Sequence, residues 1–177
     1  TSRDCPNDAA EEAALLTGEH PLSPQVELEP YLLFTGGGRR LEDCLARIAL
    51  VIDRSLGVAV SPRVYFGFFD ARENCLSIRP LIAQLEERAR YYQINRLIGP
   101  INASFWLSYR MKIDQFDTPA YFGEAVNPPH YPRLLEAAGF EIEESYRSNF
   151  YAAESQLAQR MKQRQEQFAK LGYSIRA

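Results

Sequence analysis

The chain has 177 residues and a net charge of −3, with 46% hydrophobic and 24% charged residues. This length and composition are typical of one globular domain with a sizeable core. The negative charge gives no general attraction to nucleic acid, and no uninterrupted apolar run approaches the length of a membrane-spanning helix. We therefore expect neither a nucleic-acid partner nor a membrane partner.

The cysteines and the N-terminal composition indicate a reducing compartment. Cys5, Cys44 and Cys75 are odd in number and widely spaced, which favours neither a disulfide framework nor a metal site. Residues 1–12 are acidic and lack the basic stretch and apolar run of a signal peptide. We expect a cytoplasmic protein without a bound metal.

The first third of the chain predicts an arm followed by a β-hairpin. Residues 1–26 carry three prolines and little periodicity, although residues 9–16 are compatible with a short helix. Residues 30–35 and the branched apolar run 44–53 are interpreted as two strands joined by a glycine-rich turn. Residues 41–51 are also compatible with a helix, because short apolar runs are ambiguous.

A strand–helix–strand unit is predicted in the middle of the chain. Residues 64–70 have high β-propensity, residues 81–92 place apolar side chains at helical spacing, and residues 96–99 form a short apolar run. Because a helix connects the two strands, they should run parallel.

The second half predicts shorter elements. Residues 103–111 are interpreted as one or two helical turns, and residues 134–138 as a short amphipathic helix that Gly139 ends. Residues 141–151 alternate loosely and are interpreted as the last long strand.

The C-terminal segment predicts a helix from 152 to 171, ended by Gly172. It is interpreted as an exposed helix with one docking stripe or, alternatively, as a homodimer contact. We divide the chain into an N-terminal arm (1–26), a main domain (27–151) and a C-terminal helix and tail (152–177).

Three motifs carry a resemblance to a known family. GPINAS stands at residues 99–104, NPPHY at residues 127–131 and GF at residues 139–140. Together they resemble the second half of the GNAT (GCN5-related N-acetyltransferase) fold. More narrowly, they resemble a bacterial branch in which a GP-N-S element precedes NP-x-Y…GF. The resemblance covers residues 28–151 and implies a mixed α/β fold, with a splayed central mixed sheet flanked by helices.

The resemblance also implies an activity and a cofactor. The expected reaction is transfer of an acyl group from acetyl-CoA or another acyl-CoA to a small-molecule or peptide amine by direct attack. Backbone groups of the strand that includes Phe68 and Phe69 would pair with the pantetheine arm. Arg72, Arg79 and the N-terminus of the following helix would hold phosphate.

Four residues are candidates for orienting the thioester and moving protons. Asn102 and Ser104 would orient the thioester, or alternatively cap a helix at 103–111. Tyr131, with its pKa lowered by a pocket, would act as general acid, and His130 as general base. The alternatives are a packed tyrosine ring and a proline turn at a helix start.

Four further residues are candidates for binding the substrate: Trp106, Tyr121, Glu124 and Asn127. Aromatic rings often line acyl pockets, and a carboxylate among them can deprotonate an amine. Core packing for the rings and a solvated loop position for Glu124 stay open as alternatives.

Two departures from the family pattern keep other functions open. The segment 70–80 has no glycine to admit a phosphate, and Leu135 stands where many members have a tyrosine general acid. The chain is therefore also compatible with a non-catalytic GNAT-like binding or assembly domain. A third hypothesis is acyl transfer from an acyl-carrier protein, whose arm brings no pyrophosphate to this place. The sequence alone leaves open whether the chain is an enzyme.

Overall fold

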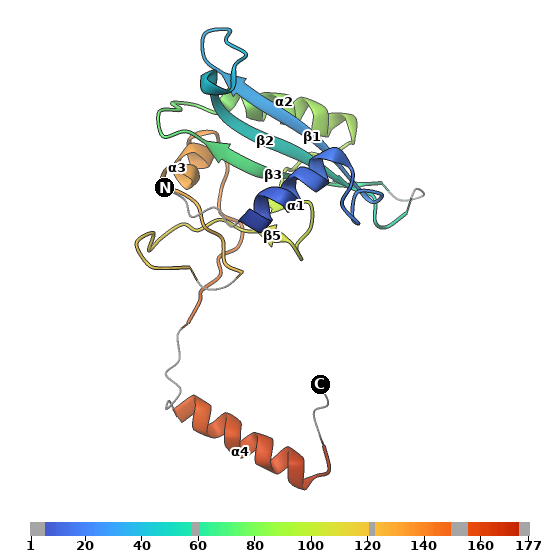
Figure 1. The fold of residues 1–177 in the computed structure, drawn as a ribbon, viewed down its shortest axis with the longest axis vertical. Coiled ribbons are helices and arrows are strands. Elements are labelled where there is room, and N and C mark those ends of the chain that lie inside the picture. The colour runs from blue at the N-terminus through green and yellow to red at the C-terminus, as the bar shows by residue number, and fades with distance from the viewer. Residues whose placement is uncertain (1–5, 58–60, 121–122, 150–155, 174–177) are drawn as a thin grey trace. The chain divides into compact units, whose positions relative to one another are not determined.

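Three antiparallel strands, in the order β1–β2–β3, form the main sheet (Figure 1). β1 spans Val26–Phe34, β2 spans Cys44–Asp53 and β3 spans Arg63–Ala71. The predicted hairpin is confirmed, because β1 pairs antiparallel with β2. The helical alternative for residues 41–51 is wrong, apart from a single 3-10 turn, η1, at Leu41–Asp43.

The computed structural model describes residues 6–57, 61–120, 123–149 and 156–173. The chain forms two compact units, Thr1–Glu141 and Ile142–Ala177. The described residues contain four α-helices and a small antiparallel sheet, so the expected mixed α/β class is confirmed.

The two faces of the sheet carry separate cores, because successive side chains of a strand point to opposite faces. Ile48, Leu50 and Ile52 of β2 belong to one core, whereas Ala49 and Val51 belong to the other. This burial on both sides explains why β2 is a nearly continuous apolar run.

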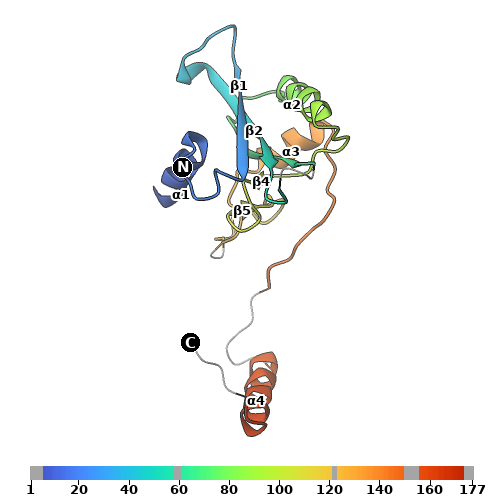
Figure 2. The same ribbon diagram turned by 90° about the vertical axis from the view of Figure 1, so that its right-hand side faces the viewer.

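Helices cover both faces of the sheet (Figure 2). α2 (Arg79–Tyr91) and α3 (His130–Ala137) cover the first core, and α1 (Pro6–Thr17) reaches the second through the buried Leu15. The helices predicted within these three segments are confirmed. Gly139, with φ +103°, follows α3, and the Phe140 N–H donates to the Leu135 carbonyl at 3.0 Å, as expected for a helix C-terminus.

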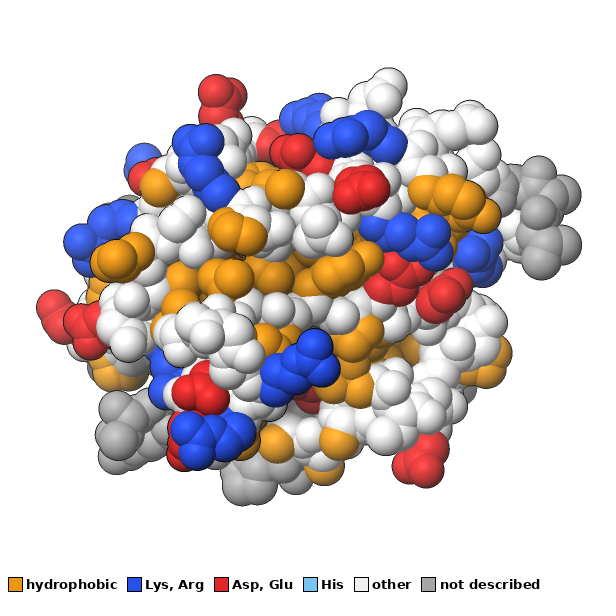
Figure 3. Space-filling model, turned by 90° about the horizontal axis from the view of Figure 1, so that it is seen from above, with side chains coloured by type: hydrophobic (Ala, Val, Ile, Leu, Met, Phe, Trp, Pro, Cys, Tyr) orange, Lys and Arg blue, Asp and Glu red, His pale blue; other side chains and the backbone are white. Residues whose placement is uncertain are grey.

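β1 is an outer strand of the sheet. It contains Pro30, which has no N–H to donate and is tolerated on an edge strand. Seen from above, apolar side chains form a band between charged ones (Figure 3). Leu32 of β1, which is 54% exposed, shows that the apolar residues of this edge are not all covered.

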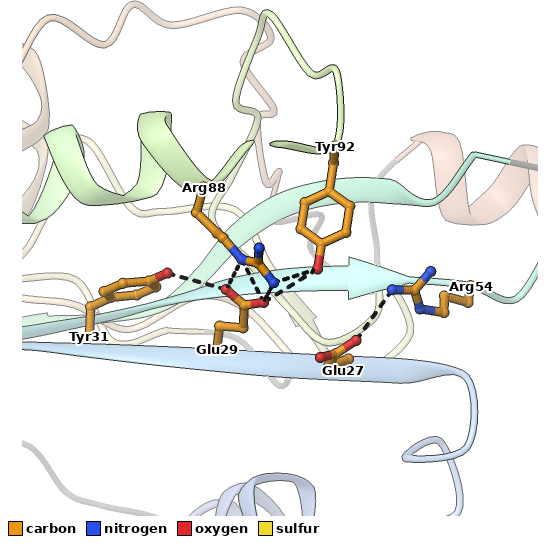
Figure 4. Close-up of polar contacts among 6 residues, drawn as sticks. All are labelled: Glu27, Glu29, Tyr31, Arg54, Arg88 and Tyr92. Carbon is orange, nitrogen blue, oxygen red and sulfur yellow. Dashed lines mark hydrogen bonds and ion pairs between the residues drawn. The ribbon is translucent and has the colours of Figure 1, made fainter. Parts of the chain in front are cut away.

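A charged cluster ties α2 to β1 (Figure 4). Arg88 donates to both oxygens of Glu29, at 2.6 Å from Nη2 and 2.8 Å from Nε. The hydroxyls of Tyr31 and Tyr92 also donate to Glu29, at 3.2 and 3.3 Å. The hydrogen bonds from Arg88 hold the pKa of Glu29 below its usual value.

The predicted strand at 96–99 is reduced to a single bridge. Ile98 pairs in parallel with Tyr65, and the Phe66 N–H donates to the Ile98 carbonyl at 3.0 Å. The predicted parallel direction is therefore confirmed, whereas the predicted strand is wrong.

The predicted helical turns at 103–111 are also wrong. β4 (Ile101–Asn102) and β5 (Ser108–Tyr109) form an antiparallel hairpin instead. Ala103, with φ +64°, and Arg110, with φ +77°, are left-handed, which a right-handed helix cannot accommodate.

The second unit contains α4 (Gln156–Lys170), which confirms the terminal helix, although its predicted start at residue 152 lies outside the described residues. Gly172 has φ +84°, and the Tyr173 N–H donates to the Phe168 carbonyl at 3.1 Å, as expected at a C-cap. The predicted strand at 141–151 is wrong over 141–149, which have no regular structure, and the rest of it lies outside the described residues.

A bulge in β3 sets the position of the β4–β5 hairpin. Ala49 of β2 faces Gly67, but Arg47 faces Asp70, so β3 has one extra residue here. Phe68 in the bulge has φ +52°, and its N–H donates to Asn102 Oδ1 at 2.7 Å. A Cβ on Gly67 would overlap the Ile101 carbonyl oxygen, so only glycine permits this approach.

We expect Gly67→Ala to lower the free energy of unfolding by about 3 kcal/mol, because the clash is with backbone atoms that cannot move away easily. Gly37→Ala is the control, since a Cβ on Gly37 would meet only open space and the substitution should cost about 1 kcal/mol for the φ of +78° alone. Urea unfolding of both variants measures the difference. Equal losses of unfolding free energy in the two variants would show that the close approach of Ile101 to residue 67 does not add to the cost of the substitution.

We expect Glu29→Gln to reduce the loss of stability in acid. The lowered pKa of Glu29 gives a stabilisation that is present above the pKa of an unfolded glutamate, about 4.3, and is lost as pH falls through the folded value. Unfolding free energies from about pH 6 to about pH 3 should therefore fall less in Glu29→Gln than in the wild type. In an Arg88→Met background the substitution should change this slope much less. The same change in both backgrounds would contradict the assigned role of Arg88.

Candidate functional site

A small hollow lies near the carboxyl end of β3, beside β4, β5 and the start of α3. Its volume is about 110 Å³. The residues around it come from segments far apart in the sequence: Phe69, Pro100, Asn102, Ser108, Tyr109, Arg110, Met111, Ala125, Val126, Asn127 and Tyr131. Polar and aromatic side chains therefore share one small space.

Tyr131 is held between β3 and α3. It is buried, its hydroxyl donates to the Asp70 carboxylate, and its ring lies 5.0 Å from that of Phe69. Burial raises the pKa of Tyr131, and the hydrogen bond to Asp70 raises it further. The expected lowering of the Tyr131 pKa is therefore wrong: the phenol keeps its proton at neutral pH but is a weaker acid than a free tyrosine.

His130 lies beside Tyr131 but has a structural partner. Its Nε2 is 2.8 Å from the carbonyl oxygen of Ala71. Because a carbonyl can only accept, Nε2 must carry the proton in this contact. Only Nδ1 remains to accept a proton.

Asn102 and Ser104 have different roles. Asn102 lines the hollow, and its Oδ1 accepts the hydrogen bond from the Phe68 N–H. Ser104 Oγ accepts a hydrogen bond from the Trp106 N–H at 3.2 Å, inside the β4–β5 turn. Trp106 is 95% exposed and does not line the hollow.

The two arginines expected to hold phosphate donate to backbone carbonyls. Arg72 donates to the Glu42 carbonyl at 3.0 Å and to the Leu41 carbonyl at 3.2 Å. Arg79 donates to the carbonyl of Ala137, the last residue of α3, at 3.1 Å from Nη2. Both guanidinium groups thus join separate segments of the fold.

Asn127 fastens one wall of the hollow. Its Oδ1 accepts from the Lys112 N–H at 2.7 Å, and its Nδ2 donates to the Lys112 carbonyl at 3.1 Å. Glu124 is half-buried outside the lining of the hollow, and Tyr121 lies outside the described residues.

The structure thus brings four sequence-predicted site residues together at the hollow: Phe69, Asn102, Asn127 and Tyr131. Sequence reasoning missed Ser108 and Arg110 because it placed residues 103–111 in a helix. A cation among aromatic residues in this segment was the available signal for Arg110.

We expect Tyr131→Phe to flatten the loss of stability in alkali. The pKa of Tyr131 is raised, so its stabilisation is fully present below the unfolded tyrosine pKa of about 10 and is lost as pH rises toward the folded value. Urea unfolding from about pH 8 to about pH 11 measures the slope. The control is Tyr91→Phe, which removes the hydroxyl of an exposed tyrosine at the end of α2 and should retain the wild-type slope. An unchanged slope in Tyr131→Phe would show that ionisation of this phenol does not cause the loss of stability in alkali.

Comparison with known proteins identifies no relative. No family model, no curated protein and no solved structure matches the chain. In the part of the chain that the structure describes, no helix is long and apolar enough to cross a membrane. Within the same residues, no group of three or more His, Cys, Asp or Glu side chains is placed to hold a metal ion. The function is therefore inferred from the chemistry of the hollow together with the resemblance of the motifs.

Proposed function

We propose that the protein is a GNAT-like acyltransferase that moves an acyl group from acyl-CoA to an amine. The supporting observation is that Phe69, Asn102, Asn127 and Tyr131, all expected from the resemblance, converge on one hollow. The hollow lies near the carboxyl end of β3, where the resemblance places the acyl donor. The parallel bridge between Tyr65 and Ile98 is compatible with the parallel pair of strands that the resemblance implies.

The size of the hollow limits what it holds. Sites for drug-sized ligands have volumes of about 300–1,000 Å³, whereas this hollow has about 110 Å³. It suits the reacting groups of the acyl donor and of a small acceptor. The nucleotide and most of the pantetheine arm of CoA would lie outside it.

The proposed reaction is direct attack. The amine nitrogen attacks the thioester carbonyl carbon, a C–N bond forms and the C–S bond breaks. The CoA thiolate takes a proton from Tyr131, and the proton that the nitrogen loses restores the phenol, so the products are an amide and the CoA thiol. Asn102 keeps its Nδ2 donors for the thioester oxygen, because Oδ1 is the atom that binds the Phe68 N–H. Tyr131 is the proposed general acid for the thiolate, although it is a weaker acid than a free tyrosine while burial and its hydrogen bond to Asp70 raise its pKa.

The expected phosphate contacts require a rearrangement. Arg72 and Arg79 would have to release the carbonyls of Leu41, Glu42 and Ala137 to bind a pyrophosphate. This observation favours a second candidate function, a non-catalytic GNAT-like binding or assembly domain. It also suits an acyl-carrier protein as donor, because no pyrophosphate then needs these arginines.

A cytoplasmic location is part of the proposal. Among the described residues Cys44 and Cys75 are free, which suits a reducing compartment. The acceptor, an amine of a small molecule or peptide, and a homodimer are also proposals.

We expect acetyl-CoA or a longer acyl-CoA to bind with a micromolar Kd in calorimetry. At a ligand concentration of 100 Kd it should stabilise the fold by about 2.7 kcal/mol, measured as a rise in melting temperature. Tyr131→Phe should bind the acyl-CoA as the wild type does but release thiol at least about tenfold more slowly with an amine present, since a general acid contributes about 10²–10⁴-fold. Tyr91→Phe, at an exposed position at the end of α2, is the control and should match the wild type.

No binding at millimolar acyl-CoA would overturn the acyl-CoA proposal. Transfer from an acylated carrier protein would then identify the donor. Failure of both donors would leave the non-catalytic domain. If acyl-CoA binds equally well to the wild type and to Tyr131→Phe but no amine is acylated, the non-catalytic domain is again the remaining function.

A further inference from the structure

We infer that Glu12 and Arg47 are positioning residues for Tyr131, the proposed general acid, and that they act on it through the carboxylate of Asp70. While α1 is docked on the sheet, Glu12 occupies much of Arg47, so that Asp70 holds the phenol proton more firmly. The inference rests on the proposed function for the role of Tyr131 as an acid. The coupling between the four side chains rests on their contacts alone.

Four side chains from four elements form one continuous polar chain. Glu12 of α1 accepts hydrogen bonds from Nη1 and Nη2 of Arg47 on β2, the second at 3.2 Å. Arg47 Nε lies 3.6 Å from Asp70 Oδ2 on β3. Asp70 Oδ1 accepts the hydrogen bond of the Tyr131 hydroxyl on α3. The chain therefore connects the N-terminal helix to the lining of the hollow.

Arg47 is a single cation between two carboxylates. It faces Asp70 in the register of β2 and β3, so the two side chains lie on the same face of the sheet. Both terminal nitrogens of Arg47 bind Glu12, which leaves Nε for Asp70 at the distance of an ion pair rather than of a hydrogen bond. The two carboxylates thus compete for one guanidinium, and Glu12 has the closer contact.

This competition determines how strongly Asp70 binds the phenol. Burial and the hydrogen bond to Asp70 raise the pKa of Tyr131, whereas the charge of Arg47 acts in the opposite direction. Without the charge of Glu12, Arg47 is able to pair more closely with Asp70, and a neutralised carboxylate is a weaker acceptor for the phenol. Loss of Glu12 should therefore make Tyr131 a stronger acid, and loss of Arg47 should make it a weaker one.

Two further titratable groups lie near Tyr131. The ring of His130 is 4.9 Å from that of Tyr131, and its Nε2 is in contact with the Ala71 carbonyl. Arg110 lines the same hollow as Tyr131. Substitutions at residues 12 and 47 leave both groups in place, so they test the polar chain separately from its surroundings.

The test replaces Tyr131 with 3,5-difluorotyrosine in the full chain and follows the ionisation of this one phenol by ¹⁹F NMR against pH. The fluorine atoms make the phenol more acidic, which brings its titration into a range in which the protein stays folded. We expect Glu12→Gln to raise the ionisation constant about two- to fivefold, the range for one partly exposed ion pair. Glu11→Gln is the matched control, since it removes the next carboxylate of α1, whose partner is His20, and should leave the titration unchanged.

Two further backgrounds test the route of the coupling. In Arg47→Met and in Asp70→Asn, addition of Glu12→Gln should change the ionisation constant by less than about twofold, because the chain is already interrupted. Either background is sufficient if the other fails to fold. An equal effect of Glu12→Gln with and without these substitutions would show that its charge acts directly, and no effect in the otherwise unchanged chain would show that the coupling does not exist. Each of these two results would overturn the inference.

The outcomes separate this inference from the proposed function. The ¹⁹F titration needs no acyl-CoA, so a shift by Glu12→Gln in a chain that binds no acyl-CoA would support the coupling and contradict the proposed reaction alone. When both hold, Glu12→Gln in the native chain should release thiol from acetyl-CoA faster than the wild type, with the loss of rate in alkali moved to lower pH. A shifted titration with an unchanged rate and pH profile would overturn the role of Glu12 and Arg47 in the reaction.

Discussion

The contact between the β3 bulge and β4 determines whether a hollow exists at all. Gly67 lets the Ile101 carbonyl approach β3, and the adjacent Phe68 N–H is satisfied by Asn102 Oδ1. A buried N–H without an acceptor costs about 1–3 kcal/mol, so the bulge depends on this side chain as much as the hairpin depends on the bulge. With the hairpin in this position, Ser108, Tyr109 and Arg110 are placed around the same space as Tyr131.

Local sequence signals were sufficient to predict the secondary structure of a segment that depends mainly on its own residues. The branched apolar run 44–53 favours β2, although a helix over 41–51 was also compatible with it, and the structure shows the strand, whose buried side chains alternate between two cores. Gly139 and Gly172 were recognisable as helix ends because a left-handed residue is needed there. The segment 103–111 could not be predicted in the same way. Asn102 resembles a helix cap locally, but its hydrogen-bond partner Phe68 lies 34 positions away.

The candidate site was predictable only in part, for the same reason. Asn102, Asn127 and Tyr131 were found through the motifs and Phe69 through the strand order that the resemblance implies, and all four line one hollow. The partners of Arg72 and Arg79 are backbone carbonyls of η1 and α3, which carry no signal in the sequence. A surface arginine near a strand–helix connection has the charge to bind phosphate. It also has the donors to satisfy carbonyls at helix ends, and only the tertiary structure distinguishes these roles.

The hydrogen bond between Tyr131 and Asp70 connects the proposed reaction to the proposed acceptor. While the phenol donates to the carboxylate, it is not available to a leaving thiolate. An acceptor ammonium near Asp70 competes with the phenol for that carboxylate, because a charged donor forms the stronger hydrogen bond. Weakening the bond to Asp70 lowers the pKa of Tyr131 toward its usual value, since this bond is one of its causes. In this scheme the arrival of the amine makes the general acid stronger, so that proton transfer to thiolate is coupled to occupation of the acceptor site.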